Sequence, residues 1–210
     1  MIPAFPVYLF DVDGTLLDSQ LDICGAILTV FANRGRTDVT HEMLVPYIGR
    51  HLIDEFADFG FQPEELDEML AEYRQVYPQR KHANTQVYGG IHDVLARLGG
   101  RKSTATTKGT PTTKAVLDQF RLIDHFDHVQ GTDGFPAKPE PNVLFKSIQA
   151  LGVRPEDCLF VGDSTSDMEA GRRAGIRTCA VTWGYGKPEE LAKFQPDFWA
   201  HSPYELLPEF

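Results

Sequence analysis

Two aspartates at the end of an apolar run are the residues of this sequence best suited to chemistry. The run Val7-Tyr8-Leu9-Phe10 leads directly into Asp11, and Asp13 and Gly14 follow. A short apolar run of this kind predicts a buried strand, and a turn at the glycine lets both carboxylates face one pocket. One carboxylate can then attack an electrophile as a nucleophile while the other transfers protons.

Two other interpretations of this segment were weighed. Asp-x-Asp-Gly also occurs in calcium-binding EF-hand loops, but aligning Gly14 with the loop glycine places Leu9 at the first ligand position. The same alignment places Gln20 where the final glutamate belongs, so the calcium-loop interpretation fails. A strand that ends in acidic residues by chance is the second alternative, and this segment alone leaves it open.

Three further polar segments follow along the chain. They contain hydroxyl groups in Ala105-Thr106-Thr107-Lys108, a cation at Lys138 between prolines, and two carboxylates in Gly162-Asp163-Ser164-Thr165-Ser166-Asp167. Asp163 and Asp167 are four residues apart, so they share one face if a helix begins there. A lysine offers positive charge to an anion, and hard cations such as Mg²⁺ prefer carboxylate oxygens.

The elements expected around these residues indicate an α/β fold. Apolar runs at 158–161 and 178–182 predict two more buried strands, and a helix-like stretch at 168–174 between them ends at Gly175. Alternating strands and helices predict a doubly wound, Rossmann-like parallel sheet. Ligands bind such sheets at the carboxyl ends of the strands, where both aspartate-bearing segments would meet.

A helical insert interrupts this core early. Residues 18–85 predict helices without an obvious strand, and the clearest helix begins at Pro63. We therefore expect a core domain of residues 1–17 and 86–210 and a helical cap domain of residues 18–85. Eight acidic residues and no lysine or arginine lie between Asp54 and Glu72, a pattern interpreted as a solvated outer face.

Composition narrows the function further. The chain has 210 residues, a formal net charge of −10 and no run of basic residues, which argues against nucleic acid as a partner. No apolar stretch approaches the roughly 20 residues that span a bilayer, and no secretion signal is expected. Three distant cysteines without CxxC pairing favour a reducing compartment. We expect a cytoplasmic protein, a monomer or homodimer, that binds no nucleic acid and no membrane.

The four polar segments, in this order, resemble motifs I to IV of the haloacid-dehalogenase-like superfamily. The resemblance implies Asp11 as nucleophile and Asp13 as general acid and base. It implies a phosphate site and a Mg²⁺ site, with Asp13 contributing its main-chain carbonyl and Asp167 binding directly or through water. The implied phosphate ligands are Thr106, Thr107 and Lys138, and the implied metal ligands are Asp11, Asp13, Asp163 and Asp167.

One segment departs from the family pattern. The stretch Arg101-Lys102-Ser103-Thr104-Ala105 is far more polar than the strand that usually precedes motif II. Thr104, Thr106 and Thr107 therefore compete for the motif II role.

Within the superfamily, the insert resembles a type C1 cap, and the motifs resemble phosphoglycolate phosphatases. An acid at position 13 argues against the dehalogenase branch. The resemblance implies a Mg²⁺-dependent phosphatase that acts on a small phosphorylated metabolite through an aspartyl-phosphate, with 2-phosphoglycolate as a candidate substrate. Arg50 follows Gly49 where similar enzymes place a substrate-facing loop, and its planar fork suits a carboxylate. For Arg50, the alternative is an ordinary exposed arginine. For the protein as a whole, two alternatives stay open: a β-phosphoglucomutase-like mutase and a catalytically silent binding protein.

Overall fold

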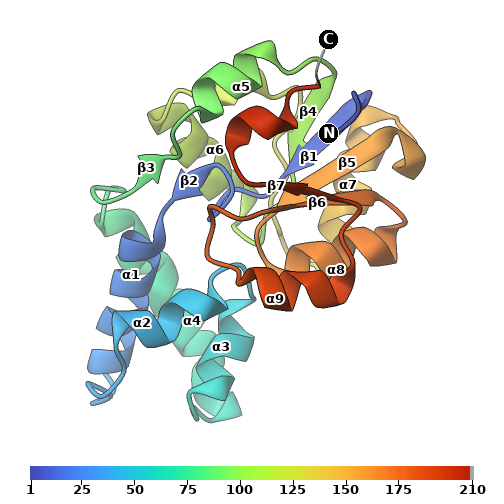
Figure 1. Ribbon diagram of the computed structural model, residues 1–210. Helices are drawn as coiled ribbons and strands as arrows, with labels where there is room; N and C mark the ends of the chain where they lie inside the picture. Colours follow the sequence, from blue (N-terminus) through green and yellow to red (C-terminus); the bar gives the residue numbers. More distant parts are fainter. Residues whose placement is uncertain (209–210) are drawn as a thin grey trace.

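A parallel five-stranded sheet forms the centre of the molecule. The computed structural model describes residues 1–208. Neighbouring strands pair in parallel throughout, in the spatial order β4-β1-β5-β6-β7 (Figure 1). This sheet confirms the predicted α/β fold class. The strands are β1 (Val7–Phe10), β4 (Arg101–Thr104), β5 (Cys158–Gly162), β6 (Arg177–Val181) and β7 (Phe198–Ala200).

Helices cover both faces of the sheet. Tyr8 and Phe10 pack with apolar residues of α5 (Ile91–Arg97) and α6 (Thr110–Gln119). Val7 and Leu9 point to the other face and pack with α7 (Asn142–Leu151) and α8 (Thr165–Ala174). Side chains alternate across a strand, so a continuous apolar run such as β1 is the pattern of a strand buried on both faces.

Shorter helical segments complete this core. They are α9 (Pro188–Leu191) and the 3₁₀ helices η2 (Ile123–His125), η3 (Pro155–Asp157), η4 (Ala192–Phe194) and η5 (Pro203–Leu206). α8 ends as expected, because Gly175 adopts the left-handed conformation at the helix C-cap. Among residues 1–208, no helix has the length and apolar character needed to cross a membrane.

Four helices between β1 and β3 pack around a core of their own. They are α1 (Gln20–Ala32), α2 (His41–Leu44), α3 (Leu52–Asp58) and α4 (Pro63–Gln79), with η1 (Val45–Tyr47) between the second and third. Phe31, Phe56 and Met69 are fully buried among them. α4 begins at Pro63 as predicted, and Glu65 accepts a hydrogen bond from the Gln62 amide. Figure 1 shows this helical unit beside the carboxyl ends of the sheet.

Two short strands join the helical unit to the sheet domain. β2 (Leu17–Asp18) and β3 (Gln86–Val87) pair antiparallel where the chain leaves and re-enters the core. The Asp22 carboxylate ties these crossings together by accepting hydrogen bonds from the Asn84 amide (2.9 Å) and the Thr85 hydroxyl (2.8 Å). The Tyr185 hydroxyl accepts hydrogen bonds from the first amides after β2, on Ser19 and Gln20.

The polar strand β4 lies at the edge of the sheet. Its polar groups bond to the segment beside it. Ser103 Oγ lies 3.1 Å from His128 Nδ1, and the Lys102 amide donates to Asp127. Ser103 and Thr104 are fully buried although β4 is an edge strand. Hydrogen bonds to His128 and to the Gln130 backbone satisfy their hydroxyl groups, so burial of these polar side chains is compensated.

Candidate active site

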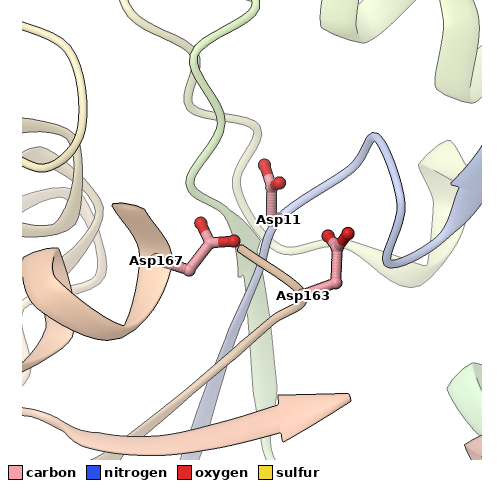
Figure 2. A group of neighbouring side chains, drawn as sticks. All are labelled: Asp11, Asp163 and Asp167. Carbon is pink, nitrogen blue, oxygen red and sulfur yellow. The ribbon is translucent and has the colours of Figure 1, made fainter. Parts of the chain in front are cut away.

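Strands β1 and β5 bring Asp11 and Asp163 together. The two strands are in register, with Phe10 opposite Val161, and the Asp11 amide donates a hydrogen bond of 2.9 Å to the Val161 carbonyl. Asp11 follows β1 directly, and Asp163 follows β5 directly. Their carboxylates therefore lie at the same edge of the sheet, where ligands of doubly wound folds bind (Figure 2).

Helix α8 adds a third carboxylate. A capping box at its N-terminus joins Ser164 and Asp167: the Asp167 amide donates to Ser164 Oγ, and the Ser164 amide donates to Asp167 Oδ2. Asp167 lies on this first turn and faces the strand ends (Figure 2). Asp11, Asp163 and Asp167 are buried, and an oxygen of each lies within 4.8 Å of the others.

Lys138 is the cation of this cluster. Its Nζ lies 2.8 Å from Asp11 Oδ1 and 2.5 Å from Asp167 Oδ1, and the residue is only 1% exposed. Burial alone would lower the pKa of Lys138, but the two carboxylates outweigh burial and raise it above its ordinary value. The Lys138 ammonium therefore stays charged next to Asp11.

The cluster carries more negative than positive charge. Burial raises the pKa of Asp11 to about 7, with Lys138 opposing and Asp167 adding to the rise. Burial, then Asp167 and Asp11, raise the pKa of Asp163 well above its ordinary range. Buried carboxylates without enough positive charge resist ionisation, and a divalent cation bound among them removes this penalty. The oxygen donors are those that Mg²⁺ prefers, so the three residues fit a magnesium site.

Asp13 lies outside the carboxylate cluster. Its Oδ1 accepts a hydrogen bond of 2.6 Å from the Ser19 hydroxyl, and its Oδ2 lies 3.2 Å from Lys108 Nζ. The cluster therefore contains the side chains of three of the four predicted metal residues. For Asp13, the resemblance implied the main-chain carbonyl as ligand, which leaves the carboxylate available for proton transfer.

Gly14 is required by the close approach of Asp163. The glycine has φ +85°, and a Cβ atom there would lie 2.2 Å from Asp163 Oδ2. Asp163 also accepts hydrogen bonds from the Thr15 hydroxyl (3.0 Å) and the Tyr185 amide (2.8 Å). Both the left-handed conformation and the lack of space exclude any larger residue at this turn.

The threonines after β4 have different surroundings. The Thr104 hydroxyl bonds to the backbone of Gln130 on both its donor and acceptor sides. Thr106 is fully buried, and its hydroxyl oxygen accepts from the Lys108 amide, which leaves its proton available to an anion. Thr107 is partly exposed and lines a cavity. These contacts favour Thr106 over Thr104 as a phosphate ligand.

Lys108 is a site residue for which the sequence analysis assigned no role. Its side chain is only 8% exposed and reaches both Asp13 and the Tyr77 hydroxyl of α4, 3.0 Å away. It therefore joins the sheet domain to a helix of the insert. Its position directly after the motif II threonines was the available signal, but a lone lysine in a polar loop is usually exposed.

A cavity of about 400 Å³ separates the sheet domain from the helical insert. Arg50 lines it, but its Nη1 forms an ion pair with Asp58 (2.9 Å) and its guanidinium lies over the Tyr47 ring. The cavity walls come from both domains. They include Asp13, Thr107 and Lys108 on one side and Ile23, Leu52, Glu55, Tyr73, Arg74 and Tyr77 on the other.

Glu55 departs from the interpretation of the acidic stretch as a solvated outer face. Most of those eight acidic side chains are exposed or partly exposed, but Glu55 is only 2% exposed and lines the cavity. Burial raises the pKa of Glu55 to about 8, with Arg50 opposing and Asp58 adding to the rise. The available signal was helical spacing, since Glu55 lies three residues after the apolar Leu52 on α3.

Known proteins resemble this chain over nearly its whole length. A family model described as haloacid dehalogenase-like hydrolase matches residues 8–181. The chain is 34% identical to Phosphoglycolate phosphatase 1 of Pseudomonas aeruginosa, over 95% of this chain and 78% of that protein. It is 30% identical to Pyrophosphatase PpaX of Bacillus cereus, over 95% of this chain and 94% of that protein. A haloacid dehalogenase-like family hydrolase from Streptococcus pneumoniae matches with a TM-score of 0.89 and 28% identity, over 96% of both chains. The chain belongs to the haloacid dehalogenase-like hydrolase family.

Proposed function

We propose that this protein is a Mg²⁺-dependent phosphatase that hydrolyses a small phosphomonoester through an aspartyl-phosphate on Asp11. The observation that carries the proposal is the buried cluster in which Asp11 lies 2.8 Å from Lys138 and close to Asp163 and Asp167. It combines a nucleophile, a cation for an anionic substrate and a set of metal ligands. The names of the phosphatase relatives support the same reaction class.

The first half of the reaction transfers the phosphoryl group to Asp11. A carboxylate oxygen of Asp11 attacks phosphorus, and the bond from phosphorus to the leaving oxygen breaks. Asp13 donates a proton to that oxygen, so the leaving group departs as a neutral alcohol. Asp11, Asp163 and Asp167 would hold Mg²⁺, which would supply charge neutralisation between the two anions.

The second half hydrolyses the aspartyl-phosphate. Asp13, now a carboxylate, accepts a proton from the attacking water, and inorganic phosphate leaves as Asp11 is regenerated. Lys108 and the Ser19 hydroxyl hold the Asp13 side chain in place on either side. Lys138 and the Thr106 hydroxyl stabilise the non-bridging oxygens throughout.

For the substrate, 2-phosphoglycolate is the candidate. Its carboxylate matches the role proposed for Arg50, which lines the cavity on the side opposite Asp13. The Arg50 guanidinium is paired with Asp58. It would bind the substrate carboxylate either in addition to Asp58 or in its place. A relative named phosphoglycolate phosphatase supports this choice, whereas a relative named pyrophosphatase makes pyrophosphate the second compound to assay.

A metal-dependent assay tests the proposal. The native protein should release phosphate from p-nitrophenyl phosphate and from 2-phosphoglycolate with Mg²⁺, and not after chelation. Asp11→Asn should abolish turnover, whereas Asp67→Asn, an exposed carboxylate of α4, serves as the matched control and should not. Circular dichroism verifies that both variants are folded. Near-native turnover in a folded Asp11→Asn variant contradicts the covalent mechanism.

A further inference from the structure

One carboxyl oxygen in the cavity wall has no partner. Glu55 Oε1 is completely buried and makes no hydrogen bond within the described residues. Leaving a buried polar atom unpaired costs roughly 1–3 kcal/mol. Lining the cavity beside it are apolar and aromatic residues of the insert, namely Ile23, Leu52, Leu70 and Tyr73. Arg50 and Tyr73 also line the cavity. Neither hydrogen-bonds to Glu55 Oε1 within the described residues, so a group bound in the cavity can supply the missing partner.

The cavity is also where the leaving group must lie. The proposed general acid, Asp13, lines the same cavity and protonates the leaving oxygen. The phosphoryl group is held at the strand ends by Thr106 and Lys138, so the rest of the substrate extends from Asp13 into the space that Glu55 borders. The helical insert therefore supplies the wall that contacts the leaving group.

We propose that Glu55 is a specificity-determining residue that hydrogen-bonds a hydroxyl group on the leaving group of the substrate. This inference rests on the proposed phosphatase function and adds to it a preference for phosphomonoesters that carry a hydroxyl over matched compounds that lack it. A hydroxyl both donates and accepts hydrogen bonds, so it pairs with a carboxylate and with a carboxylic acid alike.

Other leaving groups pair with only one form of Glu55. An ammonium group needs the ionised carboxylate, and a substrate carboxylate needs the protonated acid. With the pKa of Glu55 raised to about 8 by burial, both forms are present near neutral pH. The hydroxyl is the group that satisfies the buried oxygen across this range. A substrate carboxylate, as in 2-phosphoglycolate, would bind Arg50 instead of Glu55. A phosphorylated hydroxy acid could make both contacts, with its carboxylate on Arg50 and its hydroxyl on Glu55.

Matched substrate pairs test this inference. 2-Phosphoglycerate and 2-phospholactate differ by one hydroxyl and share a carboxylate, and glycerol 1-phosphate and propyl phosphate differ in hydroxyls without a carboxylate. For the native protein, kcat/KM should be at least about tenfold higher for the hydroxylated member of each pair. The other member leaves the Glu55 oxygen unpaired, and a tenfold ratio corresponds to a cost of roughly 1.4 kcal/mol.

Variants at position 55 identify the residue responsible. Glu55→Leu should bring the ratio within each pair close to one, because no polar group remains on the wall. Glu55→Gln should keep the preference, because an amide also donates and accepts. Glu68→Leu, which removes an exposed acidic side chain of α4, is the matched control and should keep the native ratio. Glu55→Met replaces Glu55→Leu if that variant does not fold.

Each outcome decides the question. A native enzyme without preference for the hydroxylated members, or a folded Glu55→Leu variant that keeps the native ratio, overturns the inference while leaving the phosphatase function intact. Failure of the native protein to hydrolyse p-nitrophenyl phosphate with Mg²⁺ overturns the proposed function, and the inference with it.

Discussion

Replacing Glu55 with glutamine should stabilise the protein in a pH-dependent manner. In the folded protein, burial raises the pKa of this carboxyl from 4.5 to about 8. Below pH 4.5 the glutamate is neutral in the folded and unfolded states, so it resembles glutamine. Between the two pKa values the unfolded chain releases its proton and the folded one keeps it. The free energy of unfolding of the native protein therefore falls relative to the variant as pH rises.

The magnitude follows from the two pKa values. Each pH unit between them changes the free energy of unfolding by about 1.4 kcal/mol, so the penalty approaches about 5 kcal/mol above pH 8. Water that enters the cavity screens the ionised carboxylate and lowers this penalty. We therefore expect Glu55→Gln to be more stable than the native protein by about 2–5 kcal/mol at pH 9, and by less than about 1 kcal/mol at pH 5.

Urea unfolding at pH 5, 7 and 9, followed by circular dichroism, measures this difference. Glu68→Gln is the control, because this exposed side chain should give the same small difference at every pH. A Glu55→Gln advantage that is equal at pH 5 and pH 9, or that shrinks as pH rises, would refute the assignment of Glu55 as a buried carboxyl with a raised pKa.

Three further predictions concern activity. Asp13→Asn should lower kcat by about 10²–10⁴-fold, the usual contribution of general acid–base catalysis, and near-native kcat would assign proton transfer elsewhere. Calcium should bind and inhibit in competition with Mg²⁺, because its larger coordination shell would engage both oxygens of Asp11 and leave none free to attack. Full activity in calcium alone would argue against this nucleophile. Arg50→Ala should lower kcat/KM for 2-phosphoglycolate by at least about 1.5 kcal/mol and change p-nitrophenyl phosphate hydrolysis much less. Equal losses on both substrates would remove Arg50 from the specificity account.

Local sequence patterns predicted much of the core and its family. The run before Asp11 is apolar at every position because β1 is covered by helices on both faces, so it could be identified without any tertiary information. Pro63 and Gly175 mark helix ends through backbone preferences that act within one turn. The family prediction is confirmed by the match over residues 8–181, because its motifs are short, ordered segments that can be recognised one by one.

The surroundings of individual polar side chains needed the tertiary structure. The Lys108 side chain is largely buried between Asp13 and the hydroxyl of Tyr77, which is 31 residues away in the chain. The Thr104 hydroxyl donates its proton to the backbone carbonyl of Gln130, in the segment beside the edge strand. The Thr106 hydroxyl only accepts, from the Lys108 amide, so its proton stays available for a phosphate. Contacts between distant segments depend on how the elements pack, which no local pattern records.

The acidic stretch shows the same limit most clearly. By itself, the sequence determined that residues 54–72 are rich in carboxylates and helical, and solvated helices commonly have this composition. Only the packing of α3 in the folded insert decided which of these carboxylates are buried. Glu55 is buried at the cavity wall, whereas the exposed Asp58 forms an ion pair with Arg50. Charge density is a property of the segment, whereas burial depends on which face of the helix the rest of the protein covers.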